Sequence, residues 1–197
     1  MTQVYTLPLG AYQTNCYVVH REGQTQCIVI DPGYDANQVL SFLEEKELSP
    51  VAILLTHGHF DHVGAVRDLV ALTDCPVYLH PEETTMPPQM TAGPLYYTHP
   101  LAWGQTLSLA GMQIDVFHTP GHTPGSVCFA IEDLLFTGDT LFAGSCGRTD
   151  LPGGSWATIT QSLACLRGLQ TPYRVFPGHG DSTTLEREKT ANPYLRG

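Results

Sequence analysis

The chain has 197 residues, of which 42% are hydrophobic and 14% are charged, so it can build one domain or at most two small ones. The formal net charge is −10 and the nine lysines and arginines are scattered, which argues against a nucleic-acid partner, because phosphate binding needs clustered cations. No apolar run approaches the roughly 20 residues that cross a bilayer, and the N-terminus lacks the charged and apolar regions of a signal peptide. We therefore expect a cytoplasmic protein with neither a membrane nor a nucleic-acid partner.

The six cysteines show no CxxC pair and lie mostly in apolar stretches. This pattern is typical of reduced, buried thiols in a cytosolic protein rather than of a disulfide framework.

The first half of the chain predicts three consecutive strands followed by alternating helices and strands. The β-branched centres Tyr17-Val18-Val19 and Ile28-Val29-Ile30 mark two of the strands. The expected strands are 3–8, 14–20, 26–31, 51–55 and 77–79, and the expected helices are 35–47 and 62–73.

Residues 81–104 differ in character from the rest, because they are rich in proline, methionine and aromatic residues. We expect a short helical piece at 82–86 and loop elsewhere. A long loop inside a compact domain is often functional, but an ordinary crossover over the sheet explains the segment equally well.

The second half repeats the pattern after about residue 105. The expected strands are 106–109, 112–118, 126–131, 134–137 and 173–176, and the expected helices are 155–169 and a short tail at 183–190. A Gly-rich loop, AGSCGRTDLPGG, separates two of these elements at 143–154. The pattern alone predicts an α/β protein with mixed sheets.

The segment VAILLTHGHFDH at 51–62 combines a buried strand with a cluster of metal ligands. His57, His59, Asp61 and His62 fall within six positions, directly after the strand. Side chains at alternate positions of an extended segment project to the same side, and Gly58 lets the backbone bend around an ion. Imidazole and carboxylate without thiolate suit zinc, and also iron or manganese.

Three further candidate ligands follow strands later in the chain, and each has a glycine neighbour that permits a tight turn. They are His122 in TPGHTPGS, Asp139 in FTGDTLF and His179 in FPGHG.

The order and the flanking residues of these motifs resemble the metallo-β-lactamase superfamily along nearly the whole chain. The resemblance implies one domain over residues 1–197, folded as a four-layer αββα sandwich, with two divalent metal ions, of which zinc is favoured over iron or manganese. It assigns His57, His59 and His122 to one metal, Asp61, His62 and His179 to the second, and Asp139 to both.

Within the superfamily, the chain resembles small glyoxalase II-like hydrolases in LFAGSCGRTDLPGG at 141–154 and in NPYL at 192–195. This implies hydrolysis of S-lactoylglutathione or a related acyl thioester by a metal-bridging hydroxide, with Asp61 as a catalytic residue that orients the hydroxide proton. A thiolate leaves readily, because its conjugate acid has a pKa of about 8.5, so no separate general acid is required. Arg148 would bind the glycyl carboxylate of glutathione, or alternatively pair with Asp150.

The chain departs from the glyoxalase II pattern in two respects. Asp150 and Asp181 stand where the full-length enzymes carry two tyrosines that hold glutathione, and the C-terminal glutathione-binding helical domain has no counterpart in 197 residues. The substrate is therefore a small-molecule thioester that need not contain glutathione. Residues that would line the acyl or thiol side are Met86, Met90, Tyr96 and Tyr97.

Three alternatives stay open. A persulfide dioxygenase resembles this chain in the CGR loop but uses a single iron at the first site. A lactonase or another ester hydrolase would differ only in the shape of its pocket, and a non-catalytic metal-binding module would keep the ligands alone. The sequence does not indicate an oligomeric state.

The four remaining histidines are expected outside the ligand set. His118 is expected to support His122, and the other three are expected to be surface or structural residues: His20, His80 and His99.

Overall fold

The N-terminal half of the chain forms a six-stranded sheet in the computed structural model, which describes residues 1–91 and 93–196. Strands β1 to β3 are antiparallel because short turns join them, whereas β3 to β6 are parallel and are joined by longer, mostly helical connections. In spatial order the strands are β1 (Thr2–Leu9), β2 (Thr14–Arg21), β3 (Gln26–Ile30), β4 (Ser49–Leu54), β5 (Val77–Leu79) and β6 (His99–Pro100).

A second six-stranded sheet follows. Strands β7 to β10 form an antiparallel meander, and β13 then joins β10 in parallel after a helical crossover. In spatial order the strands are β14 (Thr183–Thr184), β13 (Arg174–Pro177), β10 (Leu134–Gly138), β9 (Val127–Ile131), β8 (Met112–His118) and β7 (Thr106–Leu109).

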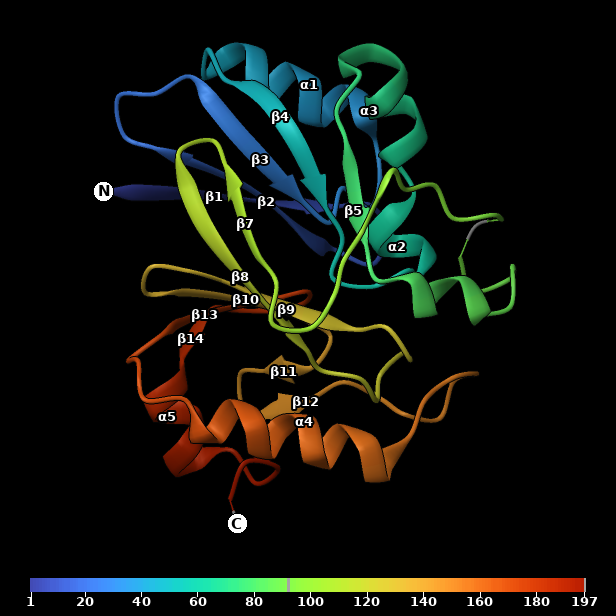
Figure 1. Cartoon of the computed structure of the whole chain (residues 1–197), viewed down its shortest axis with the longest axis vertical. Helices are drawn as coiled ribbons and strands as arrows, with labels where there is room; N and C mark the ends of the chain where they lie inside the picture. The colour runs from blue at the N-terminus through green and yellow to red at the C-terminus, as the bar shows by residue number, and fades with distance from the viewer. Residues whose placement is uncertain (92, 197) are drawn as a thin grey trace.

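Helices cover the outer face of each sheet (Figure 1). Helices α1 (Ala36–Glu45) and α3 (Val66–Thr73) lie over the first sheet, and α4 (Trp156–Gly168) and α5 (Leu185–Ala191) lie over the second. The two sheets face each other between these helix pairs, which confirms the expected αββα sandwich.

Within residues 1–91 and 93–196, no helix combines the length and the apolar character needed to cross a membrane.

Alternate residues of the central strands pack into different cores. In β2, Val18 packs under the helices of the first sheet, whereas Val19 faces the second sheet. In β9, Phe129 lies between the sheets and Cys128 packs toward α4. Both faces of these strands are buried, which explains why they read as continuous apolar runs in the sequence.

The expected helix at 62–73 is wrong in one respect, because two helices cover this range. Helix α2 (Phe60–Val63) ends before α3 begins at Val66. A Cβ atom on Gly64 would lie 2.4 Å from the carbonyl oxygen of Gly33, and the Ala65 amide donates to Pro32 O at 3.0 Å. The close contact with residues 32–33 therefore interrupts the helix.

Two segments expected as loop contain short regular elements. Residues 81–104 hold the 3-10 helix η1 (Pro81–Thr85), close to the expected helical piece, and also strand β6. The Gly-rich segment holds a small hairpin of β11 (Leu141–Phe142) and β12 (Ser145–Cys146), and the tail begins with β14 before α5.

The six cysteines lie in the described ranges and are free thiols, of which four are buried, Cys146 is half-buried and Cys165 is exposed. Burial raises the pKa of Cys27 and of Cys128 to about 12.

We expect iodoacetamide at pH 8 to modify Cys165 rapidly in the native protein and the buried thiols only after unfolding, because the thiolate is the nucleophile. Mass spectrometry of the wild type and of Cys165→Ser checks this, and rapid alkylation of Cys128 in the folded protein would contradict it.

Candidate metal centre

The seven side chains predicted as ligands converge from both sheets. They follow the C-terminal ends of strands β4, β10 and β13, begin α2, or lie in the turn between β8 and β9. The set is His57, His59, Asp61, His62, His122, Asp139 and His179.

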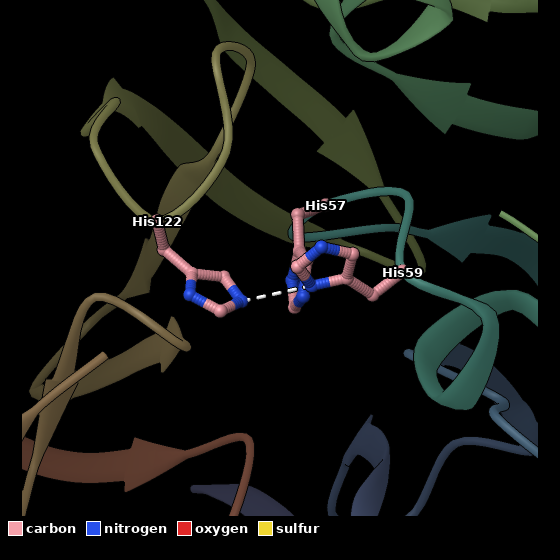
Figure 2. A group of neighbouring side chains, drawn as sticks. All are labelled: His57, His59 and His122. Atoms are coloured by element: carbon pink, nitrogen blue, oxygen red, sulfur yellow. Dashed lines mark hydrogen bonds between the residues drawn. The ribbon is translucent and has the colours of Figure 1, made fainter. Parts of the chain in front are cut away.

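The first group comprises three buried histidines, His57, His59 and His122, whose ligand atoms all lie within 4.8 Å of one another. His122 approaches from the β8–β9 turn and points toward the two histidines of the loop after β4 (Figure 2). Its Nε2 lies 2.9 Å from Nδ1 of His59. Ligands around one tetrahedral ion stand about 3.3 Å apart, so this group has nearly the spacing of a coordination shell.

The second group comprises Asp61, His62 and His179, with ligand atoms again within 4.8 Å of one another. His179 Nε2 lies 3.2 Å from Asp61 Oδ2 and 3.4 Å from His62 Nε2. Asp139 lies between the two groups: its Oδ2 is 3.4 Å from His122 Nε2 and 3.6 Å from His179 Nε2, and its Oδ1 is 3.4 Å from His62 Nε2. A carboxylate in this position can contact an ion in either group.

Hydrogen bonds to oxygen atoms fix the orientation of four imidazoles. The Nδ1 partners are Thr56 Oγ1 for His57 at 3.1 Å, Asp31 Oδ2 for His62 at 2.9 Å, Arg148 O for His122 at 2.8 Å and Tyr12 O for His179 at 3.3 Å. We assign the proton to Nδ1 in each ring from this network. In the neutral form of each ring the lone pair of Nε2 is then free, as metal ligation requires.

Several buried polar atoms at the centre have no hydrogen-bond partner among the described residues. They include His57 Nε2, His59 Nε2 and Asp139 Oδ1. An unpartnered buried polar atom is costly, and most such atoms in proteins are paired. The donor set and these unpartnered atoms fit divalent metal ions.

The protonation states differ between the two groups. Burial lowers the pKa of His57 and of His122, and burial with His122 nearby lowers the pKa of His59 to about 4, so the first group is neutral at pH 7. Burial alone would lower the pKa of His62, but the carboxylates of Asp139 and Asp31 raise it well above its ordinary value. Negative charge is thus concentrated around the second group.

Asp31 supports both groups and was missed in the sequence. Its Oδ1 accepts the Thr56 amide at 2.7 Å, and its Oδ2 accepts the Thr56 hydroxyl at 2.6 Å and Nδ1–H of His62 at 2.9 Å. Asp31 is buried and lies just after β3, where DPG reads only as a turn signal.

Glu83 was also missed, and it joins the two loops that carry the first group. Its side chain is fully buried in η1, where Oε2 accepts the Gly58 amide at 2.5 Å and Oε1 accepts the Gly125 amide at 2.6 Å. Gly58 lies between His57 and His59, and Gly125 closes the turn that carries His122. The 81–104 segment therefore supports the loops that carry the first group. This role combines the two interpretations given above, a functional loop and a crossover over the sheet.

A cavity of about 540 Å³ opens onto the centre. Met90 lines it, as expected, but Met86 is buried against the Gly58 loop, and Tyr96 and Tyr97 pack against the core of the first sheet. The expectation that all four residues line the substrate site is therefore wrong for three of them.

Arg148 lines the same cavity but its guanidinium pairs with Asp150. Nε and Nη2 each lie 2.7 Å from a carboxylate oxygen, and both side chains are exposed. The main-chain carbonyl of Arg148 meanwhile accepts Nδ1–H of His122. The structure therefore contains the Asp150 pairing that the sequence left as an alternative.

The other histidines lie outside the two groups. His80 and His118 stack with ring centroids 4.3 Å apart. The Glu82 amide donates to His80 Nδ1 at 3.4 Å. His118 Nε2 donates to Pro124 O at 3.0 Å. His20 stacks on Tyr5, and His99 stacks on Tyr78. His118 contacts the turn that carries His122 through Pro124 O, and the ligand atoms of His80, Glu82 and His118 lie within 4.8 Å of one another.

A family model described as the metallo-beta-lactamase superfamily matches residues 9–179. The chain belongs to the metallo-β-lactamase superfamily. Members of this fold bind divalent metals, and the two candidate groups lie inside the matched range.

Curated relatives cover nearly the whole chain. An uncharacterized protein of Mycobacterium leprae is 40% identical over 96% of this chain and 97% of its own length. A probable metallo-hydrolase of Bacillus subtilis is 36% identical over 97% and 96%. A protein named hydroxyacylglutathione hydrolase GloC, from Haemophilus influenzae, is 34% identical over 96% of both chains.

Similar solved structures include BLEG-1, described as a B3 metallo-beta-lactamase, with a TM-score of 0.90 and 38% identity over 100% of both chains. TTHA1623, in a di-iron-bound form, has a TM-score of 0.85 and 41% identity over 98% of this chain and 100% of that one. ETHE1 from Myxococcus xanthus has a TM-score of 0.84 and 25% identity over 97% and 83%.

Proposed function

We propose that this protein is a metal-dependent thioester hydrolase of the glyoxalase II type, acting on S-lactoylglutathione or a related acyl thioester. The observation that carries the proposal is the pair of preorganised His/Asp groups joined by Asp139, with buried unpartnered polar atoms on His57, His59 and Asp139. The relative named hydroxyacylglutathione hydrolase supports the reaction class.

In this proposal His57, His59 and His122 hold one divalent ion, Asp61, His62 and His179 hold another, and Asp139 contacts both, with zinc favoured over iron. Such ions polarise a carbonyl oxygen and lower the pKa of bound water to about 7. Nδ1–H bonds to oxygen keep Nε2 of four of these histidines aimed at the centre, whereas His59 turns its Nδ1 toward His122.

Asp61 has a second part in the proposal, as the group that orients the proton of the attacking water. Its Oδ2 accepts the Thr14 hydroxyl at 3.0 Å, which holds the carboxylate in place at the cavity wall. The sulfur departs as a thiolate, whose conjugate acid has a pKa of about 8.5, so no general acid is needed.

Arg148 is the proposed contact for a carboxylate on the thiol half of the substrate. We expect Arg148→Met to raise KM for S-lactoylglutathione about tenfold with little change in kcat, because the variant loses a charge-assisted contact that is made equally in the ground state and the transition state. Asp150→Asn should lower KM, since it releases the guanidinium from its present partner. Steady-state kinetics check this, with an N-acetylcysteamine thioester, which has no carboxylate, as the substrate that neither variant affects.

A second candidate function is persulfide dioxygenase, favoured by the likeness to ETHE1 over 97% of this chain. This candidate requires a single iron and consumes oxygen. Lactone hydrolysis and the β-lactamase activity named for BLEG-1 would use the same centre with a different pocket.

The deciding experiment measures metal content and turnover together. Protein loaded with zinc or iron is assayed against S-lactoylglutathione, short acyl thioesters, a lactone, a β-lactam and glutathione persulfide. We expect about two ions per chain and thioester hydrolysis with kcat/KM of at least about 10⁴ M⁻¹s⁻¹, lost after dialysis against a chelator and restored by metal. One iron per chain with oxygen consumption would instead favour the dioxygenase, and loaded protein that leaves every thioester intact would refute the proposal.

A further inference from the structure

A second cavity of about 610 Å³ adjoins the metal-centre cavity. The two cavities share three lining residues, Tyr12, Phe60 and Asp61. The remaining residues of the second cavity come from the end of β1, the β1–β2 turn, the segment after β3 and the break after α2: Leu9, Gly10, Ala11, Gly33, Tyr34 and Gly64.

Packing fixes the walls of this cavity. The Tyr12 ring meets Phe60 edge-on with centroids 5.3 Å apart, and the Tyr12 carbonyl accepts Nδ1–H of His179. Tyr34 packs on Gly10, where a Cβ atom would lie 3.0 Å from the Tyr34 Cβ. The main chain of Tyr12 is thus hydrogen-bonded directly to a candidate metal ligand.

The floor of the cavity is main chain that cannot carry side chains. A Cβ atom on Gly33 would fall 1.5 Å from the carbonyl oxygen of Asp61, and one on Gly64 would fall 2.4 Å from that of Gly33. These close approaches require glycine at both positions and pack the main chain of residues 33 and 61–64 together along one side of the cavity.

The lining offers little to a polar ligand. Asp61 is the one charged residue among the described residues that line this cavity, and its Oδ2 already accepts the Thr14 hydroxyl and lies 3.2 Å from His179 Nε2. Tyr12 and Tyr34 are more than 60% exposed, so the aromatic surface that they contribute to the cavity is in contact with water. The volume lies within the range of about 300–1,000 Å³ that small-molecule sites occupy.

We propose that this cavity holds the apolar acyl chain of a thioester whose carbonyl lies at the metal centre and whose thiol half extends toward Arg148. The inference rests on the proposed thioesterase function and names its substrate class: thioesters of hydrocarbon acids rather than of small hydroxy acids. Water adds its oxygen to the acyl carbon, the C–S electron pair leaves with sulfur, and the products are the carboxylic acid and the thiol. Arg148 lines the metal-centre cavity but is not among the residues of the second one, which sets the direction of the substrate.

The first test is a chain-length series of S-acylglutathiones, from acetyl to hexanoyl, with the metal-loaded enzyme. Each methylene buried in the cavity should raise kcat/KM about fourfold. Hydrolysis of the acetyl compound tests the proposed function, and the dependence on chain length tests the cavity. Equal kcat/KM for all lengths would overturn the inference and leave the thioesterase function standing.

Binding gives a readout that does not require turnover. S-methyl-, S-butyl- and S-hexylglutathione are thioethers that cannot be hydrolysed, and calorimetry should show Kd falling about fourfold per methylene. Tyr12→Ala and Tyr34→Ala should each weaken this dependence by removing a wall. Tyr194→Ala is the matched control, because this partly exposed tyrosine packs on Trp156 away from both cavities. The inference would be overturned if none of the thioethers bound. It would also be overturned if Kd depended on chain length as in the wild type in both Tyr12→Ala and Tyr34→Ala, provided that both variants unfold at the wild-type temperature.

Discussion

Asp139→Ala should lower kcat for thioester hydrolysis by at least about 10³-fold and reduce the bound metal from two ions per chain to one or fewer. The carboxylate is the group that lies within 3.4–3.6 Å of histidines in both groups. Electrostatic stabilisation by a metal contributes several kcal/mol to a transition state, and about 1.4 kcal/mol corresponds to a factor of ten in rate.

The matched control for this variant is Asp133→Ala, which removes an exposed carboxylate that pairs with Arg174 at 3.0 Å. An exposed pair of this kind contributes little to stability, so both metal content and kcat should stay within a factor of two of the wild type. Metal analysis and steady-state kinetics of both proteins give the comparison. Wild-type metal content with kcat reduced less than tenfold in Asp139→Ala would contradict the role assigned to this carboxylate.

Glu83→Gln should lower the free energy of unfolding by about 2–4 kcal/mol and weaken metal binding about 10- to 100-fold. The wild-type carboxylate accepts two main-chain amides, those of Gly58 and Gly125, inside the protein. A glutamine keeps the shape but turns one acceptor into a donor, so one buried amide loses its partner. The metal effect follows because the two amides belong to the loops that carry His57, His59 and His122, and supports of ligands change affinity by such factors.

The control is Glu44→Gln in α1, whose side chain is exposed. It should leave both quantities unchanged. Urea unfolding of the metal-free proteins measures stability, and competition with a chromophoric chelator measures zinc affinity. If Glu83→Gln lost stability but bound zinc as tightly as Glu44→Gln, Glu83 would be a structural residue without influence on the metal centre.

The candidate ligands could be predicted from the sequence because they lie in short motifs with glycine neighbours at the ends of apolar strands. His57, His59 and His62 fall within six positions, and Asp139 and His179 each follow a strand that is easy to recognise. Nearby strand ends bring such residues together once the sheets form. Asp31 and Glu83 could not be found this way, since their contacts span 25 to 42 residues and their local sequences read only as a turn and a loop.

The elements that escaped prediction share a tertiary origin. The apolar pattern of HVGAVRDLVALT continues through Gly64, and only the contact with Gly33 shows why the helix is interrupted. Strands β6, β11 and β12 have two residues each, which is too short for a period to be visible. The apolar cavity likewise combines residues from positions 9–12, 33–34 and 60–64, which no single segment reveals.

The central claim is that seven side chains hold two metal ions, and a crystal grown with zinc tests it most directly. An anomalous difference map collected at the zinc edge should show two peaks per chain, one among His57, His59 and His122 and one among Asp61, His62 and His179, with Asp139 touching both. A single peak in the first group, or imidazoles that point away from a centre without zinc, would contradict it.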